Sequence, residues 1–197
     1  MKTNPSFEFE RMSLDDFEEL LLEKPENEKW ELIDGRVYRG MVGARWEHHV
    51  IVDNIGLAIG QHLRQTKRPC RVFRETFYLK KQSDDLAALP DIMIRCGARL
   101  PGVTSIDDPV ILFEVVSPGS EAKDRMTKRL AYQKLPSLTQ YVLVARDSLF
   151  VDVYRRTREG WRGDVPLERL DDVLTLPAIE FELTLAEIYR DVIVAPV

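Results

Sequence analysis

The feature that most constrains the fold is a run of apolar, β-forming residues from Pro109 to Ser117, which one carboxylate, Glu114, interrupts. A run that is apolar on both of its faces is typical of a strand buried on both sides within a sheet. A lone carboxylate buried there costs several kcal/mol unless it is paired, bound to a metal or protonated. The run therefore predicts an α/β core in which Glu114 has a specific partner.

The residues that follow this strand have the pattern of a crossover. Glu121 to Leu135 contains good helix formers until Pro136, and Gln140 to Ala145 is again a strand-like run. A strand, a helix and a strand in this order normally leave the two strands parallel in one sheet. A further strand is expected from Leu149 to Arg155.

The N-terminal region predicts two helices and a hairpin. Ser13 followed by Asp16 resembles a capping box, here for a helix from Leu14 to Lys24. Asp34-Gly35 is the strongest short-range signal for a type I′ hairpin, which would join strands at Trp30 to Ile33 and Val37 to Arg39. Isoleucines recur every four residues from Glu47 to Leu63, so this segment is expected to be a helix with one face in the core.

Two more strands are expected from Arg71 to Leu79 and from Leu89 to Ile94, and Thr184 with Glu187 would cap a short helix through Arg190. Asp91 lies in the second of these strands, which is the run that precedes the strand carrying Glu114. Neighbouring strands are about 4.8 Å apart and Mg²⁺ binds oxygen ligands at about 2.1 Å, so these two carboxylates can reach one ion. Taken alone, Asp91 is also consistent with a turn residue and Glu114 with a buried salt bridge to an arginine.

The composition limits the class of protein. The chain has 197 residues, of which 44% are hydrophobic, so residues 1–197 are expected to form one domain with its own core. Its net charge is −5 and its pI about 5.4, which argue against a protein that coats nucleic acid through overall positive potential. Two local basic clusters could contact phosphates or form solvated faces: Arg64, Lys67, Arg68, Arg71 and Arg74, and Lys123, Arg125, Lys128, Arg129 and Lys134.

Cys70 and Cys96 are the only cysteines, and neither has a second cysteine or a histidine at zinc-finger spacing. We therefore expect two reduced thiols and no zinc site. No segment approaches the roughly 20 consecutive apolar residues of a membrane span, and the first residues lack the apolar core of a signal peptide. These features predict a soluble, cytoplasmic protein.

Pro90-Asp91 and Glu114-Val115-Val116 resemble the PD-(D/E)XK motif of the restriction-endonuclease-like superfamily. More closely, the chain resembles the Uma-type endonuclease family within that superfamily, over a region from about Leu14 to Arg155. Further motifs that carry this resemblance are Trp30 to Gly35, His48 with Ile51 and Asn54, Glu114 to Pro118, Asp124 to Lys128, and Tyr141 to Val144. The resemblance implies an α/β fold of the restriction-endonuclease-like class, with a mixed central sheet flanked by helices.

The resemblance also implies a metal-dependent endonuclease that acts on DNA. Asp91 and Glu114 would hold Mg²⁺ or Mn²⁺ with the carbonyl of Val115 as a further oxygen ligand, and Glu31 would complete the acidic set. Hard oxygen ligands suit a metal that polarises a phosphoryl oxygen and helps to generate hydroxide for in-line attack. Several enzymes of this kind act as symmetric dimers, so a homodimer is expected.

The sequence departs from the superfamily at Val116, where the motif has a lysine two residues after Glu114 and on the same strand face. The resemblance implies that Lys128, in the following helix, reaches the same place and stabilises charge in the transition state. The alternative for Lys128 is an exposed pair with Asp124, one helical turn earlier. Glu31 also has an alternative, as a hairpin residue paired with an arginine.

Three other residues in this part of the chain are expected to be structural. His48 could orient a phosphate or act as a base near pH 7. A histidine at the start of a helix is more often a capping or packing group, and we favour that interpretation. Tyr132 and Tyr141 are expected to be core aromatics with hydrogen-bonded hydroxyls.

Two functions from different classes follow. The first is a metal-dependent phosphodiesterase acting on DNA, with Asp91, Glu114, Glu31 and Lys128 in its active site. The second is a catalytically inactive module of the same fold that binds nucleic acid or protein, which Val116 and the acidic pI favour. A hydrolase of another phosphate substrate would share the same ligands, because no glycine-rich phosphate loop selects a nucleotide over a polymer.

Overall fold

The computed structural model describes residues 11–41, 43, 45–75, 77–117 and 123–193. Its six-stranded sheet has the order β11-β10-β9-β8-β6-β3, with bounds β3 Cys70–Arg74, β6 Ile92–Cys96, β8 Ile111–Val116, β9 Gln140–Ala145, β10 Val151–Thr157 and β11 Gly160–Gly163. Its five-stranded sheet has the order β2-β1-β5-β4-β7, with bounds β1 Glu28–Ile33, β2 Arg36–Met41, β4 Tyr78–Lys81, β5 Leu86–Ala88 and β7 Ser105–Ile106.

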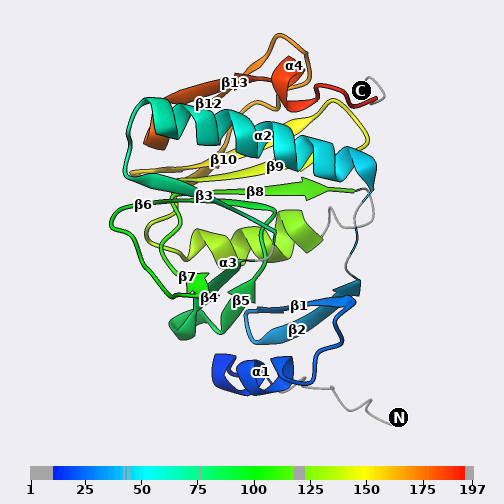
Figure 1. The fold of residues 1–197 in the computed structure, drawn as a ribbon, viewed down its shortest axis with the longest axis vertical. Coiled ribbons are helices and arrows are strands. Elements are labelled where there is room, and N and C mark those ends of the chain that lie inside the picture. The colour runs from blue at the N-terminus through cyan, green and yellow to red at the C-terminus, as the bar shows by residue number, and fades with distance from the viewer. Residues whose placement is uncertain (1–10, 42, 44, 76, 118–122, 194–197) are drawn as a thin grey trace, which may run out of the picture.

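Helices cover both faces of the six-stranded sheet. Figure 1 shows α2, Trp46–Gln65, on one face, together with the hairpin of β12 (Val173–Leu176) and β13 (Phe181–Thr184) and with α4, Leu185–Ile188. On the other face lies α3, Arg129–Gln133, and beyond it the five-stranded sheet with α1, Leu14–Leu21. The α/β architecture expected from the sequence, a mixed sheet flanked by helices, is confirmed.

The central strand β8 has the environment that its sequence predicts. All six of its residues are buried, because α2 packs on one of its faces and α3 on the other. It pairs in parallel with β9, in a register from Ile111 opposite Gln140 to Val116 opposite Ala145. The crossover expected between these two strands is therefore confirmed.

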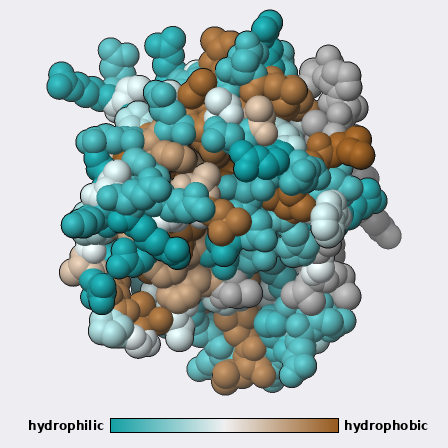
Figure 2. Space-filling model, turned by 45° about the horizontal axis from the view of Figure 1, so that its top comes forward, coloured by the Kyte–Doolittle hydropathy of each residue, from teal (hydrophilic) through white to brown (hydrophobic). Residues whose placement is uncertain are grey.

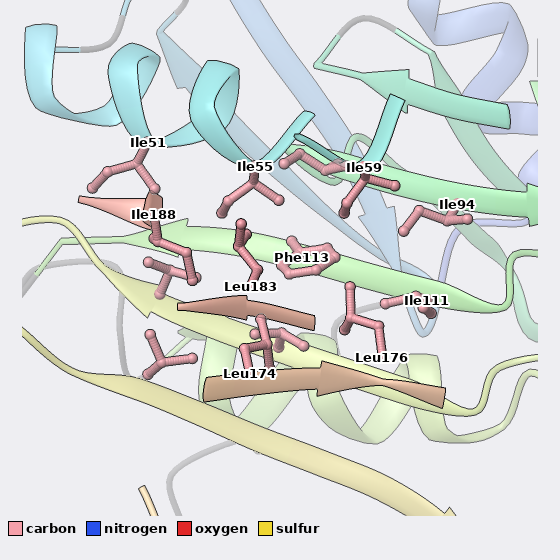
Figure 3. Packing of buried hydrophobic residues seen from close by; sticks show 14 of the residues in the cluster. Ile51, Ile55, Ile59, Ile94, Ile111, Phe113, Leu174, Leu176, Leu183 and Ile188 are labelled. Carbon is pink, nitrogen blue, oxygen red and sulfur yellow. The ribbon is translucent and has the colours of Figure 1, made fainter. Parts of the chain in front are cut away.

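The α2 face of the sheet is packed with aliphatic side chains. Figure 3 shows Ile51, Ile55 and Ile59 of α2 pointing toward β8, where Phe113 lies between them and the strand Val173–Leu176. The apolar stripe predicted for this helix is therefore its core face, and its three isoleucines are completely buried.

The hairpin and the helix caps also form as their sequences predict. Asp34 and Gly35 have φ angles of 52° and 74°, as a type I′ turn requires at both central positions. The Ser13 side chain accepts a hydrogen bond of 3.1 Å from the backbone N–H of Asp16. Thr184 forms the predicted capping box at α4. Both capped helices end earlier than predicted, α1 at Leu21 and α4 at Ile188.

The strand expected from Arg71 to Leu79 is wrong. It consists of β3 and β4, which belong to different sheets. The chain turns after Arg74, where Glu75 adopts a left-handed conformation with φ 48° and donates its N–H to the carbonyl of Asp91 at 3.1 Å. The strand expected from Leu89 begins only at Ile92, so Asp91 lies just before β6.

The crossover helix differs from the regular α-helix that was expected from Glu121 to Leu135. Residues 121 and 122 lie outside the described residues, Lys123–Lys128 form a π-helix, and α3 covers only the next five positions. π-Helical turns are rare and are frequently found at functional sites. Lys128 lies at the junction between the π-helical and α-helical segments.

The expectation of two reduced cysteines is also wrong, because Cys70 and Cys96 form a disulfide. They stand directly opposite each other in the antiparallel pair β3 and β6, with their Cα atoms 3.9 Å apart. Sequence spacing did not reveal this proximity, since the pairing of the two strands creates it. In the described residues, no helix is both long and apolar enough to cross a membrane.

Candidate active site

Four of the residues singled out in the sequence are charged side chains buried inside the protein. Glu31 and Asp91 are 5% exposed, and Glu114 and Lys128 are 3% exposed. Burial of a charge costs several kcal/mol unless a partner compensates it. These four charges therefore need contacts that compensate them.

Lys128 joins the two sheets. Its Nζ lies 2.8 Å from Oε1 of Glu114 on β8 and 3.1 Å from Oε1 of Glu31 on β1. The alternative of an exposed pair with Asp124 is wrong, since Lys128 is buried; the side chain of Asp124 lies outside the described residues. The structure thus brings together three of the residues predicted for the site.

Glu31 is fixed by the backbone of the neighbouring segment. Its Oε1 accepts a hydrogen bond of 2.9 Å from the N–H of Leu89. The cation beside it is Lys128, in place of the arginine considered as its alternative partner. Because Leu89 is followed directly by Pro90 and Asp91, Glu31 holds the segment that leads into the predicted metal ligand.

Glu114 has partners from the helix that follows its strand. Besides Lys128, the hydroxyl of Tyr132 donates to Oε1 of Glu114 at 3.0 Å. The salt bridge considered for Glu114 therefore exists, but with a lysine. Burial raises the pKa of Tyr132 well above its ordinary value, so the hydroxyl stays a donor. Val116, on the same face of the strand, packs in the apolar cluster that also contains Tyr132 and Tyr141.

Asp91 lies against the backbone that carries Glu114. Its Oδ2 accepts a hydrogen bond of 2.7 Å from the N–H of Val115, and its Oδ1 lies 3.4 Å from Nε2 of His48. Burial by itself raises the pKa of Asp91, but the contact with His48, the charge of Lys29 and the Val115 N–H together bring it below its ordinary value. Asp91 is therefore a carboxylate at neutral pH.

His48 lies beside Asp91 and does not cap α2, so the capping part of its interpretation is wrong. The residue before α2 is Arg45, and the His48 ring instead faces Asp91 and Oε1 of Glu75, at 3.6 Å. Burial lowers the pKa of His48, but the two carboxylates outweigh it and the net shift is upward. His49 contacts the same Glu75 oxygen at 3.5 Å.

No sequence motif singles out Glu75, which lies inside a segment expected to be one continuous strand. Within the described residues, His48, Glu75 and Asp91 form the one group of three whose possible metal-ligand atoms all lie within 4.8 Å of one another. Glu31 and Glu114 are not in this group, and both instead contact Lys128. A break in strand propensity at Glu75 would have been the only sequence signal.

Three further residues from the sequence motifs lie in or near this part of the molecule. Asn54 points away from the site, and its amide donates to the carbonyls of Ile188 and Arg190 at 3.0 and 2.8 Å. Val115 takes part through its N–H, and a role of its carbonyl as a metal ligand stays a prediction. Tyr141 is completely buried and packs edge-on against Tyr132.

Comparisons with known proteins identify the fold and a relative of similar length. A protein of Anabaena variabilis ATCC 29413, whose crystal structure is described as that of "a putative nuclease belonging to DUF820", is similar with a TM-score of 0.72 and 20% identity, over 90% of this chain and 97% of that chain. This likeness shows the restriction-endonuclease-like fold. A relative from Synechocystis sp. (strain ATCC 27184 / PCC 6803 / Kazusa), named "Uncharacterized protein slr1290", is 29% identical over 189 residues, which are 95% of this chain and 96% of the relative.

The family comparison covers most of the chain. The pattern of the Uma2 family, which is described as "Putative restriction endonuclease", matches residues 14–186. It continues past Arg155, where the short motifs place the end of the resemblance, and so includes the β12 and β13 hairpin. By its sequence over this range, the chain belongs to the Uma2 family.

Proposed function

We propose that this chain is a metal-dependent endonuclease that hydrolyses phosphodiester bonds in DNA. The observation that carries the proposal is the place of Lys128, whose ammonium is buried between Glu114 and Glu31 at 2.8 and 3.1 Å. The PD-(D/E)XK motif has its lysine on the strand of the glutamate, where this chain has Val116. A lysine from the next helix supplies the same charge beside the same carboxylate.

The donor atoms near this lysine suit a hard divalent cation such as Mg²⁺ or Mn²⁺. Asp91 and Glu114 are buried carboxylates, and carboxylate oxygens are the ligands that these ions prefer. Asp91 also offers an oxygen within 4.8 Å of ligand atoms from His48 and Glu75. When bound, the cation supplies polarisation of a phosphoryl oxygen and a lowered pKa for bound water.

The residues of the chain would bind and orient the reacting phosphate. The Lys128 ammonium is a fixed positive charge that stabilises negative charge as it develops on the phosphoryl oxygens. Glu31 positions Lys128, and the Leu89 N–H in turn holds Glu31. Because these groups are buried, their geometry is set before the substrate arrives and needs little reorganisation.

A specific observation favours a second candidate, a catalytically inactive module that binds nucleic acid or protein. Glu114 has both Lys128 and Tyr132 as partners, so its burial is compensated within the protein. An ion pair whose charges compensate each other in this way does not by itself require a catalytic role. Metal binding and DNA cleavage separate the two candidates.

The test is a calorimetric titration of Mn²⁺ and Mg²⁺ into the purified protein, with a plasmid-nicking assay in the same buffers. We expect the wild type to bind the ion and to nick, and Glu114→Gln to lose both. Glu182→Gln makes the same chemical change at an exposed position of β13 and is expected to behave as the wild type. A wild type that binds no ion even with DNA present would leave only the inactive module.

We also propose that the active form is a homodimer in the cytoplasm. A duplex has two strands to cut, and a symmetric dimer places one site on each strand. Analytical ultracentrifugation with and without a DNA duplex checks the assembly. A protein that nicks as a monomer would contradict the dimer and leave the endonuclease proposal intact.

A further inference from the structure

A basic groove lies between α2 and β3, the edge strand of the six-stranded sheet. Its volume is about 560 Å³, and its cationic lining residues are Arg64, Lys67, Arg68, Arg71 and Arg74. These are the residues of the first basic cluster in the sequence. In Figure 2, hydrophilic side chains crowd the left side of the molecule, the side toward which α2 ends in Figure 1.

The positive charge of this groove is only partly neutralised. Arg68 forms an ion pair with Glu180, and Arg74 forms one with Asp53. Arg64, Lys67 and Arg71 are exposed and have no carboxylate partner in the part of the chain that the structure describes. The chain as a whole has a net charge of −5, so this positively charged surface differs in sign from the net charge of the molecule.

Arg71 also lies beside another cation. It stands directly opposite Arg95 in the pairing of β3 with β6, and like charges in such positions destabilise a sheet. Nε of Arg95 donates a hydrogen bond of 2.6 Å to Oδ1 of Asp108, which compensates the charge of Arg95. Asp108 does not compensate the charge of Arg71. A second hollow of about 520 Å³ on the other side of β3 shares Lys67, Arg68 and Arg71 with the basic groove. An anion in either hollow would neutralise the same cations.

Two glycines of α2 line the basic groove. At Gly56, a Cβ atom would meet Cδ of Arg74 at 2.9 Å, so glycine allows this arginine to lie against the helix. At Gly60, a Cβ atom would meet nothing within 4 Å. Glycine inside a helix costs about 1 kcal/mol relative to alanine. The packing of Arg74 against the helix therefore explains why position 56 is a glycine. At position 60 no neighbour requires a glycine, and its lack of a side chain leaves the floor of the groove open at a cost in helix stability.

The basic groove leads to the candidate active site. β3 ends at Arg74, and the next residue is Glu75, which faces His48 and donates its N–H to the carbonyl of Asp91 at 3.1 Å. At roughly 3.3 Å per residue, the strand is about 17 Å long, which corresponds to the rise of about five nucleotides of a duplex. A polyanion lying along the groove would reach the carboxylates with one of its internal phosphates.

We propose that the basic groove binds the phosphate backbone of a polynucleotide and guides it into the active site. The proposal rests on the proposed nuclease function and adds to it the surface that holds the polymer outside the active site. A mononucleotide or another small phosphate ester would not need this surface. A small ester would fill the site beside Asp91 and leave Arg64, Lys67 and Arg71 without a ligand. Backbone phosphates spaced along the groove fit all three.

The test measures binding of a fluorescent DNA duplex by anisotropy, in the presence of a chelator and over a range of salt concentrations. Lys67→Ala with Arg71→Ala removes two cations of the groove. Arg158→Ala with Arg162→Ala removes two exposed cations at the opposite edge of the same sheet and is the matched control. A second pair, Gly60→Glu and Gly60→Gln, places side chains of equal size and different charge on the groove floor.

We expect the groove double variant to bind about tenfold more weakly or worse, with a slope of log K against log salt that is shallower by about 2, since each phosphate contact contributes about 0.9. Gly60→Glu should bind at least several-fold more weakly than Gly60→Gln, and the control should bind as the wild type does. Thermal melts confirm that all variants are folded.

The inference is overturned if the wild type does not bind the duplex, if both double variants lose affinity equally, or if Gly60→Glu and Gly60→Gln bind alike. These outcomes do not depend on cleavage, because the chelator removes divalent ions. A protein that binds through the groove but never nicks would refute only the endonuclease proposal. A protein that nicks plasmid while its groove variants bind normally would refute only the groove.

Discussion

The two faces of β8 carry the same backbone but opposite chemistry. On the α2 face, Phe113 and Val115 belong to the hydrophobic cluster that includes the isoleucines of α2. On the α3 face, Glu114 lies between Leu112 and Val116 and contacts Lys128. Alternate residues of one strand thus build an aliphatic core on one side and a buried ion pair on the other.

This difference shows how the fold separates stability from the proposed chemistry. Burial of aliphatic side chains stabilises the protein by about 1.5–3 kcal/mol for each residue. A buried ion pair contributes little net stability, because desolvation of both charges offsets their attraction. The α2 face therefore keeps the sheet rigid, and the α3 face holds charges that a protein selected for stability alone would not need.

The largest effect is expected for Lys128→Met on the charged face. The nicking rate should fall by about 10²- to 10³-fold, which is the usual effect of removing one hydrogen-bond donor that stabilises charge in a transition state. The free energy of unfolding should fall by about 3–5 kcal/mol, because Glu114 and Glu31 lose their buried cation. Plasmid nicking and urea denaturation measure the two quantities.

The double variant Lys128→Met with Glu114→Gln controls for stability. Without the charge of Glu114, part of the lost unfolding free energy should return, because only Glu31 is then left without its cation. Nicking should stay at background. If Lys128→Met nicked at the wild-type rate, the charges of the α3 face would be structural and the contrast between the two faces would disappear.

A smaller effect on nicking but a clear effect on stability is expected for Ile55→Ala on the aliphatic face. Removing this completely buried side chain should cost about 2–5 kcal/mol of unfolding free energy by leaving a cavity. Nicking per folded molecule should be unchanged at a temperature well below the Tm. Leu57→Ala, at a position of α2 that is 57% exposed, should change neither quantity measurably. Loss of nicking in folded Ile55→Ala would show that the two faces are coupled.

The smallest effect is expected for Tyr132→Phe, which keeps the ring and removes the hydrogen bond to Glu114. Unfolding free energy should fall by about 1 kcal/mol. Because burial raises the pKa of Tyr132 in the folded protein, its contribution is fully present below the unfolded pKa and is lost only as the pH rises through the folded one. The stability difference between wild type and variant should therefore be constant from neutral pH to about pH 9. A difference that already shrinks at pH 8 would contradict a protonated hydroxyl.

Much of the fold could be predicted because its signals are local. The continuous apolar run of β8, the Asp34-Gly35 turn and the isoleucine period of α2 each depend on side-chain periodicity or on backbone conformations within a few residues. The break of the Arg71 to Leu79 segment could not be predicted in the same way. Its residues favour an extended chain, and only the left-handed conformation of Glu75 redirects it into a second sheet.

The candidate site divides along the same line. The sequence by itself determined that Glu114 is a carboxylate inside an apolar strand, so that burial would force a partner on it. Only the tertiary structure decided that this partner is Lys128, that His48 and Glu75 join Asp91, and that Cys70 lies opposite Cys96. Local periodicity fixes which side chains are buried, but contacts between distant segments arise from strand pairing and helix packing, which no local pattern contains.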